Sequence, residues 1–387
     1  MARDGNAKGM KETKFKDTEL GKIPEEWEVC NLGSIGVPLM CKRIMKWQTN
    51  ETAGIPFYKI GTFGKQADAF IAPDIWRYMI THFNYPRKGD ILISAAGTIG
   101  RTVVFDGQPS YFQDSNIVWI DNDEEKVLNP YLEYAYTKIA WSTDASTISR
   151  LYNNNLKSAL ILFPHDKAEQ QRIASALSDA DALVAELDAL IEKKRAIMAG
   201  TMQELLTGKR RLQGFSGERK ETSLSYFGNV TMGQSPSSLF YNDAKDGLPL
   251  IQGNADMCNR KSIIRNYTSK ITKTCNAGDI IMSVRAPVGA VGIASFDSCI
   301  GRGVCAFKRN IFLYYLLLFI EDDWSKLSAG STFESVNGNH IRNFEVTIPS
   351  SLAEQHAIAT ILSDMDAEIA ELEAKRDKYK REFEIIF

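Results

Sequence analysis

Apolar residues recur at alternating steps of four and three along residues 173–191 of this chain. The positions are Ile173, Leu177, Ala180, Val184, Leu187 and Ile191. This is the a/d spacing of a heptad seam, which predicts a helix that pairs with another helix. Since a helix rises 1.5 Å per residue, one of roughly 40 residues is about 60 Å long and needs a partner to cover its apolar stripe.

The same pattern returns 185 residues further along, where Glu354 repeats Glu169. The second seam consists of Ile358, Leu362, Met365, Ile369 and Leu372. Two matching seams in one chain favour mutual pairing as an antiparallel coiled coil, and the same residues are candidates for subunit docking. A long helix packed in an unrelated core is the alternative. Lys194 and Arg376 interrupt the two seams, and we expect the helices to part, or to meet another subunit, at these residues.

Short apolar runs bounded by Gly, Asp and Asn precede the first long helix and predict strands. They are Pro56–Ile60, Ile91–Ser94, Thr102–Phe105 and Ile117–Ile120. A helix is expected next, with Asn129 as its cap and Pro130 in its first turn.

The region before the second long helix repeats this order. Gly278–Ser283 matches Gly89–Ser94, and the Leu248-Pro249 pair matches Ile55-Pro56. The predicted fold is therefore α/β (α+β): two similar mixed α/β domains separated by two long helices that form an antiparallel coiled coil, a pseudo-two-fold internal repeat. The expected division is 1–165 for the first domain, 166–207 for its helix, 208–217 for a linker, 218–349 for the second domain and 350–387 for its helix.

Composition changes this picture little. The 387 residues are 44% apolar and 24% charged, which is ordinary for a globular protein. The longest apolar run, Ile311–Ile320, is too short to cross a bilayer, and the polar stretch Met1–Asp17 does not resemble a signal peptide. The six cysteines form no Cys-x-x-Cys pair, so we expect a cytoplasmic protein without a metal or another cofactor.

The formal net charge of −2 is unevenly distributed. Residues 166–206 hold 5 Lys and Arg against 8 Asp and Glu, and residues 349–387 hold 5 against 9. The acidity therefore belongs to the long helices, which leaves room for a basic face on the domains and permits nucleic-acid binding.

Enzyme signatures are missing from the sequence: it has no phosphate-binding loop, dinucleotide fingerprint, zinc-protease motif or nucleophile elbow. The triplet Asn129-Pro130-Tyr131 partly matches the Asn-Pro-Pro-Tyr motif of amino-methyltransferases, but a helix start explains it better. Two alternatives to a nucleic-acid-binding protein remain. One is an enzyme with duplicated lobes, and the other is a coiled-coil scaffold that never touches DNA.

Polar, Gly-rich loops beside the predicted strands are abundant instead. Arg, Asn, Gln, Ser and Lys are the side chains that read base edges and hold phosphates. The candidate DNA-binding residues are Lys42, Arg43, Lys46, Lys59, Arg101, Gln113, Ser115, Gln234, Ser235, Ser237, Tyr241, Asn242, Asn254, Arg260, Lys261, Arg285 and Arg302.

The chain resembles the specificity (S) subunits of type I restriction-modification systems. The resemblance rests on the opening Glu19–Trp27, on the two helices that share Glu-Gln-x3-Ala-x2-Leu-Ser-Asp-x-Asp, on the segment Met202–Lys209, and on Met232–Pro236 with the residues that follow to Gly303. It implies two target-recognition domains that each read one half of a split, asymmetric DNA site, with the helices as spacer. It also implies methyltransferase (M) subunits, two of them, and restriction (R) subunits as partners, and no catalysis by the chain itself.

One departure concerns the end of the chain. Phe387 stands at the position of Met202, so the second copy has no counterpart of Gln203–Arg211 in this sequence. The apolar residues Phe383, Ile385, Ile386 and Phe387 are expected to pack against other groups.

Overall fold

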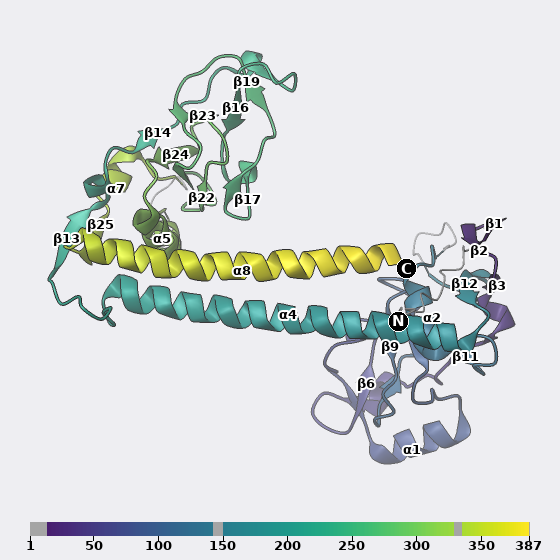
Figure 1. Cartoon of the computed structure of the whole chain (residues 1–387). Coiled ribbons are helices and arrows are strands. Elements are labelled where there is room, and N and C mark those ends of the chain that lie inside the picture. Colours follow the sequence, from purple (N-terminus) through teal and green to yellow (C-terminus); the bar gives the residue numbers. More distant parts are fainter. Residues whose placement is uncertain (1–13, 142–149, 329–334, 387) are drawn as a thin grey trace, which may run out of the picture. The chain divides into compact units, whose positions relative to one another are not determined.

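The computed structural model describes residues 14–141, 150–328 and 335–386, and the side chains of residues 325–328 and 383–386 lie outside that description. The chain divides into two compact units, Met1–Leu183 and Val184–Phe387. The boundary falls inside helix α4 (Lys167–Thr207) (Figure 1). We call the part of unit 1 before α4 the first module, and the part of unit 2 between α4 and helix α8 (Leu352–Ile386) the second module.

Two four-stranded sheets form the body of the first module. One is antiparallel with the order β4-β11-β8-β9, and the other has the order β10-β6-β7-β5 with β6 and β10 parallel. The strands are β4 (Gly36–Met40), β5 (Thr49–Asn50), β6 (Ile55–Tyr58), β7 (Phe70–Ile71), β8 (Ile91–Ser94), β9 (Thr102–Val104), β10 (Tyr111–Phe112) and β11 (Ile117–Asn122). Strand β8 is buried along its whole length, as its continuous apolar run predicts.

The remaining elements of the first module surround these sheets. Strands β1 and β2 form a hairpin, and β3 pairs with β12 just before α4 begins. The elements are β1 (Phe15–Thr18), β2 (Gly21–Pro24), β3 (Trp27–Asn31), β12 (Leu160–Pro164), α1 (Pro73–His82), α2 (Asn129–Thr137), α3 (Asn153–Ser158), and the one-turn helices η1 (Leu32–Ser34) and η2 (Lys46–Gln48).

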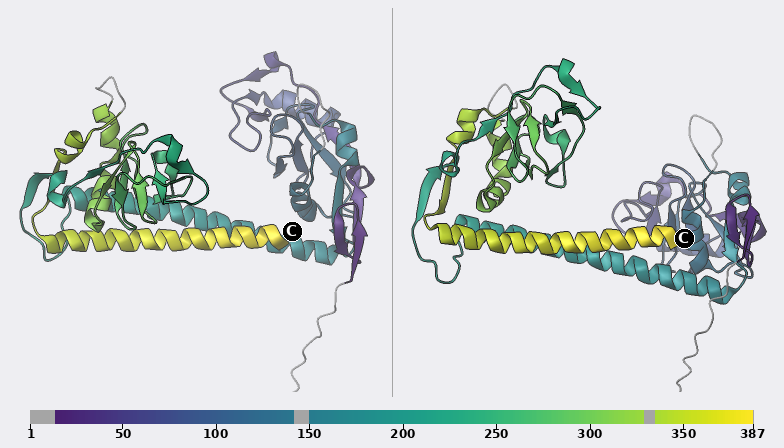
Figure 2. Two further views of the ribbon diagram at one scale, coloured as in Figure 1. Left: turned by 90° about the horizontal axis from the view of Figure 1, so that it is seen from above. Right: turned by 45° about the horizontal axis from the view of Figure 1, so that its top comes forward.

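The second module repeats this topology. Figure 2 draws both modules from two further directions. The sheets of the second module have the orders β14-β24-β21-β22-β18-β17 and β15-β19-β16-β23-β20, and β16 runs parallel to β23 as β6 does to β10. The strands are β14 (Thr231–Met232), β15 (Tyr241–Asn242), β16 (Leu248–Ile251), β17 (Met257–Cys258), β18 (Lys261–Ser262), β19 (Tyr267–Thr268), β20 (Thr274–Cys275), β21 (Ile280–Ser283), β22 (Val291–Ile293), β23 (Ser298–Ile300) and β24 (Val304–Phe307). The internal repeat predicted from the sequence is confirmed.

The modules differ by insertions between shared elements. The first carries α1 between β7 and β8, whereas the second carries β17, β18 and β20. The other elements of the second module are β13 (Arg219–Ser223), which pairs with β25 (Glu345–Pro349), the helices α5 (Ile311–Phe319), α6 (Glu321–Ser328) and α7 (Gly338–Arg342), and the one-turn helices η3 (Leu224–Phe227), η4 (Ser238–Phe240) and η5 (Asn254–Asp256).

A buried glutamine ties each long helix to the last strand of its module. The Gln170 amide Nε2 donates to the carbonyl of Pro164 at 2.8 Å, and Gln355 Nε2 donates to Pro349 at the same distance. Gln170 Oε1 also accepts from the backbone N–H of Leu128. The repeated Glu-Gln pair therefore fixes where each helix leaves its module, because a buried amide must keep its hydrogen bonds.

Helices α4 and α8 run antiparallel where both belong to unit 2 (Figure 1). Lys194 contacts Glu368 at 2.6 Å, while Asp188, earlier in α4, contacts Arg376, later in α8, at 3.1 Å. The hydrogen bond from Arg376 holds the pKa of Asp188 below its ordinary value.

Apolar residues fill the space between these helices and the second module. Helix α5 packs on α8, so the first half of α8 has apolar neighbours on two sides. The buried cluster contains the seam residues Ile191, Ile358, Leu362 and Ile369, with Met365 and Leu372 partly buried beside it, and Leu187 is buried as well. The predicted antiparallel coiled coil is confirmed. In unit 1, Leu177 is buried, Ile173 is half-buried, and Val184 at the unit boundary is half-buried too.

The structure corrects two local expectations. The helices do not part at Lys194 and Arg376, because both residues form ion pairs between α4 and α8. The other branch of that expectation, that another subunit is met there, stays a prediction. Asn129 does not cap α2: it is the first residue of that helix, and its Oδ1 accepts from Asn122 Nδ2 at 2.8 Å. Its counterpart Asn310 does cap α5, by accepting from the N–H of Leu313.

Leu362 tests the contribution of the seam to stability. Its side chain is fully buried, so Leu362→Ala is expected to lower the free energy of unfolding by about 2–5 kcal/mol. Leu352→Ala is the matched control, since Leu352 lies on the same helix and is 67% exposed; its effect should stay within about 0.5 kcal/mol. Chemical denaturation of both variants measures the difference, and equal losses would contradict burial as its cause.

Candidate nucleic-acid interface

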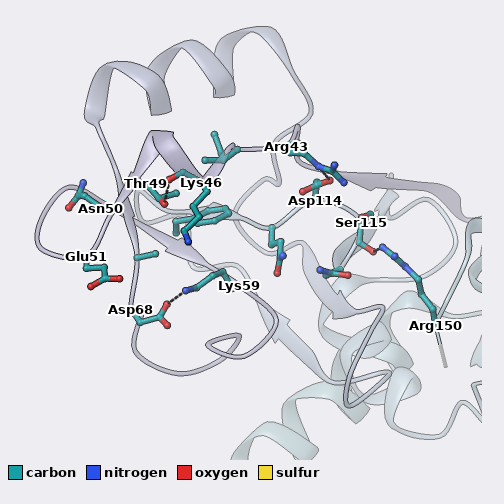
Figure 3. A pocket seen from close by; sticks show the side chains of 15 residues that line it. Arg43, Lys46, Thr49, Asn50, Glu51, Lys59, Asp68, Asp114, Ser115 and Arg150 are labelled. Atoms are coloured by element: carbon teal, nitrogen blue, oxygen red, sulfur yellow. Dashed lines mark hydrogen bonds and ion pairs between the residues drawn. The ribbon is translucent and has the colours of Figure 1, made fainter. Parts of the chain in front are cut away.

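A polar groove of about 580 Å³ opens on the first module beside the one-turn helix η2. Figure 3 shows charged and amide side chains from several loops that meet around it. The groove is lined by Arg43, Ile44, Lys46, Thr49, Asn50, Glu51, Phe57, Lys59, Asp68, Ala69, Gln113, Asp114, Ser115, Asn116 and Arg150. It brings together five of the predicted DNA-binding residues: Arg43, Lys46, Lys59, Gln113 and Ser115.

Ion pairs hold two of these cations in place. Arg43 Nε lies 2.8 Å from Asp114 Oδ2, and Lys59 Nζ lies 2.9 Å from Asp68 Oδ1 (Figure 3). All four side chains keep contact with solvent, so these pairs are weak and can exchange for a phosphate or a base edge. Each pair sets the position of a cation and also adds a carboxylate acceptor, the group that accepts from the cytosine amino group.

A second hollow of about 380 Å³ adjoins the groove, and the two share Arg43 and Asp114. It adds the predicted Lys42, whose ammonium lies 5.5 Å from the centre of the Phe83 ring. Cys41 also lines this hollow, but burial raises the pKa of its thiol to about 12, so the thiol stays protonated and is a poor nucleophile.

Two predicted residues of the first module have structural contacts. Arg101 does not line the groove: its guanidinium lies 5.1 Å from the centre of the Phe63 ring. Gln113 does line it, but its side-chain oxygen accepts from the backbone N–H of Ile60 at 3.0 Å.

Residues that sequence reasoning did not select also line the groove. Asn116 follows the predicted Ser115 directly, Asn50 lies between the predicted Lys46 and Lys59, and Arg150 comes from a distant segment. Arg150 reaches the groove because it forms a β-bridge with Ala96, and its guanidinium donates to the carbonyl of Ser115 at 2.6 Å. The internal repeat does not point to Arg150 as a binding residue, because the equivalent position in the second module is Ser335, which forms the matching β-bridge there.

In the second module, three predicted residues meet at the corresponding place. The N–H of Gln234 donates to Ile300, and the Ser235 hydroxyl accepts from the N–H of Arg302 at 3.0 Å. Gly233 makes this approach possible, because a Cβ there would lie 2.1 Å from the carbonyl of Gly301. The side chains of Gln234 and Arg302 are exposed.

Backbone hydrogen bonds show that Asp114 in the first module and Arg302 in the second occupy equivalent positions. The N–H of Gln113 donates to Tyr58 at 2.9 Å, and that of Gly301 donates to Ile251 at 2.7 Å, each next to the parallel strand pair. Asp114 and Arg302 are the next residues. In one module Asp114 contacts Arg43, and in the other Arg302 contacts Ser235, so the same two positions touch with different chemistry.

Of the other predicted residues in the second module, three stabilise turns and the remaining four lie at separate places in the fold. Ser237 caps η4, the Tyr241 hydroxyl donates to Pro236, and the Asn242 side chain accepts from the N–H of Asp246, so these three stabilise turns. Asn254 begins η5, Arg260 pairs with Glu321 at 2.7 Å, Lys261 is exposed on β18, and Arg285 is exposed and bridges to Ser335.

Neither a metal centre nor a membrane segment emerges in the part of the chain that the structure describes. No group of three or more His, Cys, Asp or Glu side chains there could hold a metal ion. None of the described helices is long and apolar enough to cross a membrane.

The comparison with protein families identifies the duplicated unit. The family described as "Type I restriction modification DNA specificity domain" matches the chain twice, over residues 24–194 and 218–378. Each match begins in one module and ends in the long helix that follows that module.

Relatives match over different shares of the chain. A proposed type I restriction enzyme specificity subunit, MjaX, from Methanocaldococcus jannaschii is 30% identical over 394 residues, covering 92% of this chain and 90% of that protein. A proposed type I restriction enzyme specificity subunit from Haemophilus influenzae is 52% identical over 174 residues, which are 45% of each chain.

Solved structures share the fold. The type I restriction-modification S subunit from M. genitalium matches with a TM-score of 0.64 at 15% identity, over 93% of this chain and 94% of that one. A chain from a study of complex assembly and conformational transition in a type I R-M system matches with a TM-score of 0.56 at 21% identity, over 94% and 96%.

Proposed function

The chain belongs to the family of type I restriction-modification DNA specificity subunits, and from this premise we propose that each module reads one half of a bipartite, asymmetric DNA site. Residues 1–165 and 218–349 are the proposed target-recognition domains, and 208–217 link the first long helix to the second domain. Cations in the groove hold phosphates, while exposed loop side chains discriminate bases.

One observation carries this proposal: the two modules share a frame but present different side chains from it. Arg43 and Asp114 in the first module correspond to Ser235 and Arg302 in the second. A carboxylate accepts from cytosine, whereas Arg donates to guanine, so equivalent positions favour different bases. A protein that reads two unlike half-sites with duplicated domains requires this combination.

The chain itself is proposed to be non-catalytic, with M subunits, two of them, and R subunits as its partners. In unit 2 the apolar seam is covered within the chain, so we expect a partner there to contact other faces of the long helices. Leu190 and Ile197 are candidates, since they lie seven residues apart on α4 and are 38% and 48% exposed.

The test is to map methylated positions in DNA from cells that carry this chain with its partner subunits, and to measure duplex binding by the purified complex as salt rises. We expect a split asymmetric motif and an affinity that falls steeply with salt, because phosphate contacts release counterions. A chain with no affinity for duplexes would support the scaffold alternative, and methyl transfer or cleavage by the isolated chain would support an enzyme.

A further inference from the structure

Two large apolar side chains stand out by their exposure. Trp47 is 79% exposed and Leu239 is 89% exposed, the highest values for a large apolar residue in the part of the chain that the structure describes. Single exposed apolar residues are common on protein surfaces, so exposure alone does not show a role.

Their positions in the fold are equivalent. Trp47 is the central residue of η2 and Leu239 is the central residue of η4, and the two are 192 residues apart. The N–H of Gln48 donates to Met45 at 2.9 Å, and the N–H of Phe240 donates to Ser237 at 3.0 Å, again 192 residues apart. Each turn follows the edge strand of one sheet, β4 or β14, and leads into the edge strand of the other, β5 or β15.

Side-chain hydrogen bonds fix both turns, by different means. In η2, Gln48 Oε1 accepts from the N–H of Met45 at 2.9 Å, and the Thr49 hydroxyl donates to Lys46 at 2.8 Å. In η4, the Ser237 side chain accepts from Leu239 N–H and the Tyr241 hydroxyl donates to Pro236. Both apolar side chains are thus presented from ordered backbone, which lowers the entropy lost when they bind a partner.

The surroundings of both turns suit a polyanion. Lys46 and Thr49, on either side of Trp47, line the polar groove of the first module. Next to Leu239, the ammonium of Lys270 lies 5.1 Å from the centre of the Phe240 ring.

An apolar side chain that both modules present at the same position cannot encode the base sequence of either half-site, because the two half-sites differ. Since Trp47 and Leu239 are almost fully exposed, they do not stabilise the core of their module either. A shared, exposed apolar side chain beside cations is suited to a contact that any DNA sequence offers. We propose that Trp47 and Leu239 are apolar wedges that enter a groove of duplex DNA and pack against the bases of the half-site that their own module reads. This rests on the proposed function and adds a sequence-independent contact to it.

The experiment uses the complex of this chain with its M subunits and two duplexes, one with the mapped site and one with both half-sites scrambled. Trp47→Ala and Leu239→Ala are each expected to weaken binding to both duplexes on the order of tenfold, because each removes an apolar side chain that is buried on binding. The slope of log affinity against log salt should not change, because an apolar contact releases no counterions. Lys46→Ala is the contrasting variant, in which the slope should fall by about one ion.

Conservative variants and a distant control separate a wedge from a folding defect. Trp47→Phe and Leu239→Met keep an apolar side chain and should retain most of the affinity, and Leu352→Ala removes an exposed apolar side chain of α8 without effect. Trp47 also allows a direct measurement: its fluorescence, taken as the difference between the unmodified and Trp47→Phe complexes, should change when duplex is added.

Two results would overturn the inference while leaving the proposed function intact. One is duplex binding that is unchanged in both Ala variants. The other is loss of M subunits from the variant complexes in gel filtration, which would make these side chains a protein contact. A complex that binds neither duplex before any substitution would defeat the proposed function and the wedge together.

Discussion

Arg302→Ala is expected to relax base preference at one position of a single half-site, by about one to two orders of magnitude. The backbone of Arg302 is held by the Ser235 hydroxyl, while its side chain is exposed. A bidentate contact from Arg to guanine discriminates by about 1–3 kcal/mol, which sets the size of the loss. Comparing the mapped motif of the variant with that of the unmodified complex measures it.

Two further variants serve as controls for this result. Asp114→Ala changes the equivalent position in the first module and should relax the other half-site only. Arg309→Ala removes an exposed Arg that precedes α5, away from the reading loops, and should leave both half-sites unchanged. If either single substitution altered both half-sites, the modules would not act independently.

Periodicity explains why the fold was accessible from the sequence. The a/d seam of Ile191, Ile358 and Leu362 requires an apolar partner, and two copies in one chain make that partner internal. The repeat then extended to the modules, because the run Ile91–Ser94 and its copy Ile280–Ser283 are fully buried strands whose apolar character leaves little choice.

The helices stay paired at the interruptions of the seam for a physical reason. Lys194 and Arg376 look out of place in a list of apolar residues, but each has a carboxylate across the helix pair, Glu368 and Asp188. A pattern read along one helix contains no information about the register of the other, so these ion pairs could not be predicted.

The candidate site was only partly accessible from the sequence. Polar loop residues serve two purposes that composition cannot separate: Ser237 and Asn242 stabilise turns, whereas Arg43 and Lys46 line the groove. Arg150 was missed because a long-range β-bridge brings it to the groove, and such contacts depend on the folded backbone.

Inserting four residues into α4 between Glu186 and Leu190 is expected to lengthen the unspecified gap of the DNA site and to leave both half-site sequences as they are. Four helical residues add about 6 Å, which corresponds to about two base pairs of B-DNA. Such an insertion is tolerated in coiled coils as a stutter that unwinds the helix locally. Loss of methylation at the original site, together with its appearance at a wider one, is the predicted outcome.

A matched insertion distinguishes helix length from general damage. Four residues added to the linker after Gly214, outside both helices, should leave the gap unchanged, because they do not lengthen α4. Deleting four residues from Glu186–Leu190 should shorten the gap by a similar amount. The insertion lengthens α4 and the deletion shortens it, so shifts of the gap in opposite directions would identify α4 as the spacer. A changed half-site sequence with an unchanged gap would refute that role of α4.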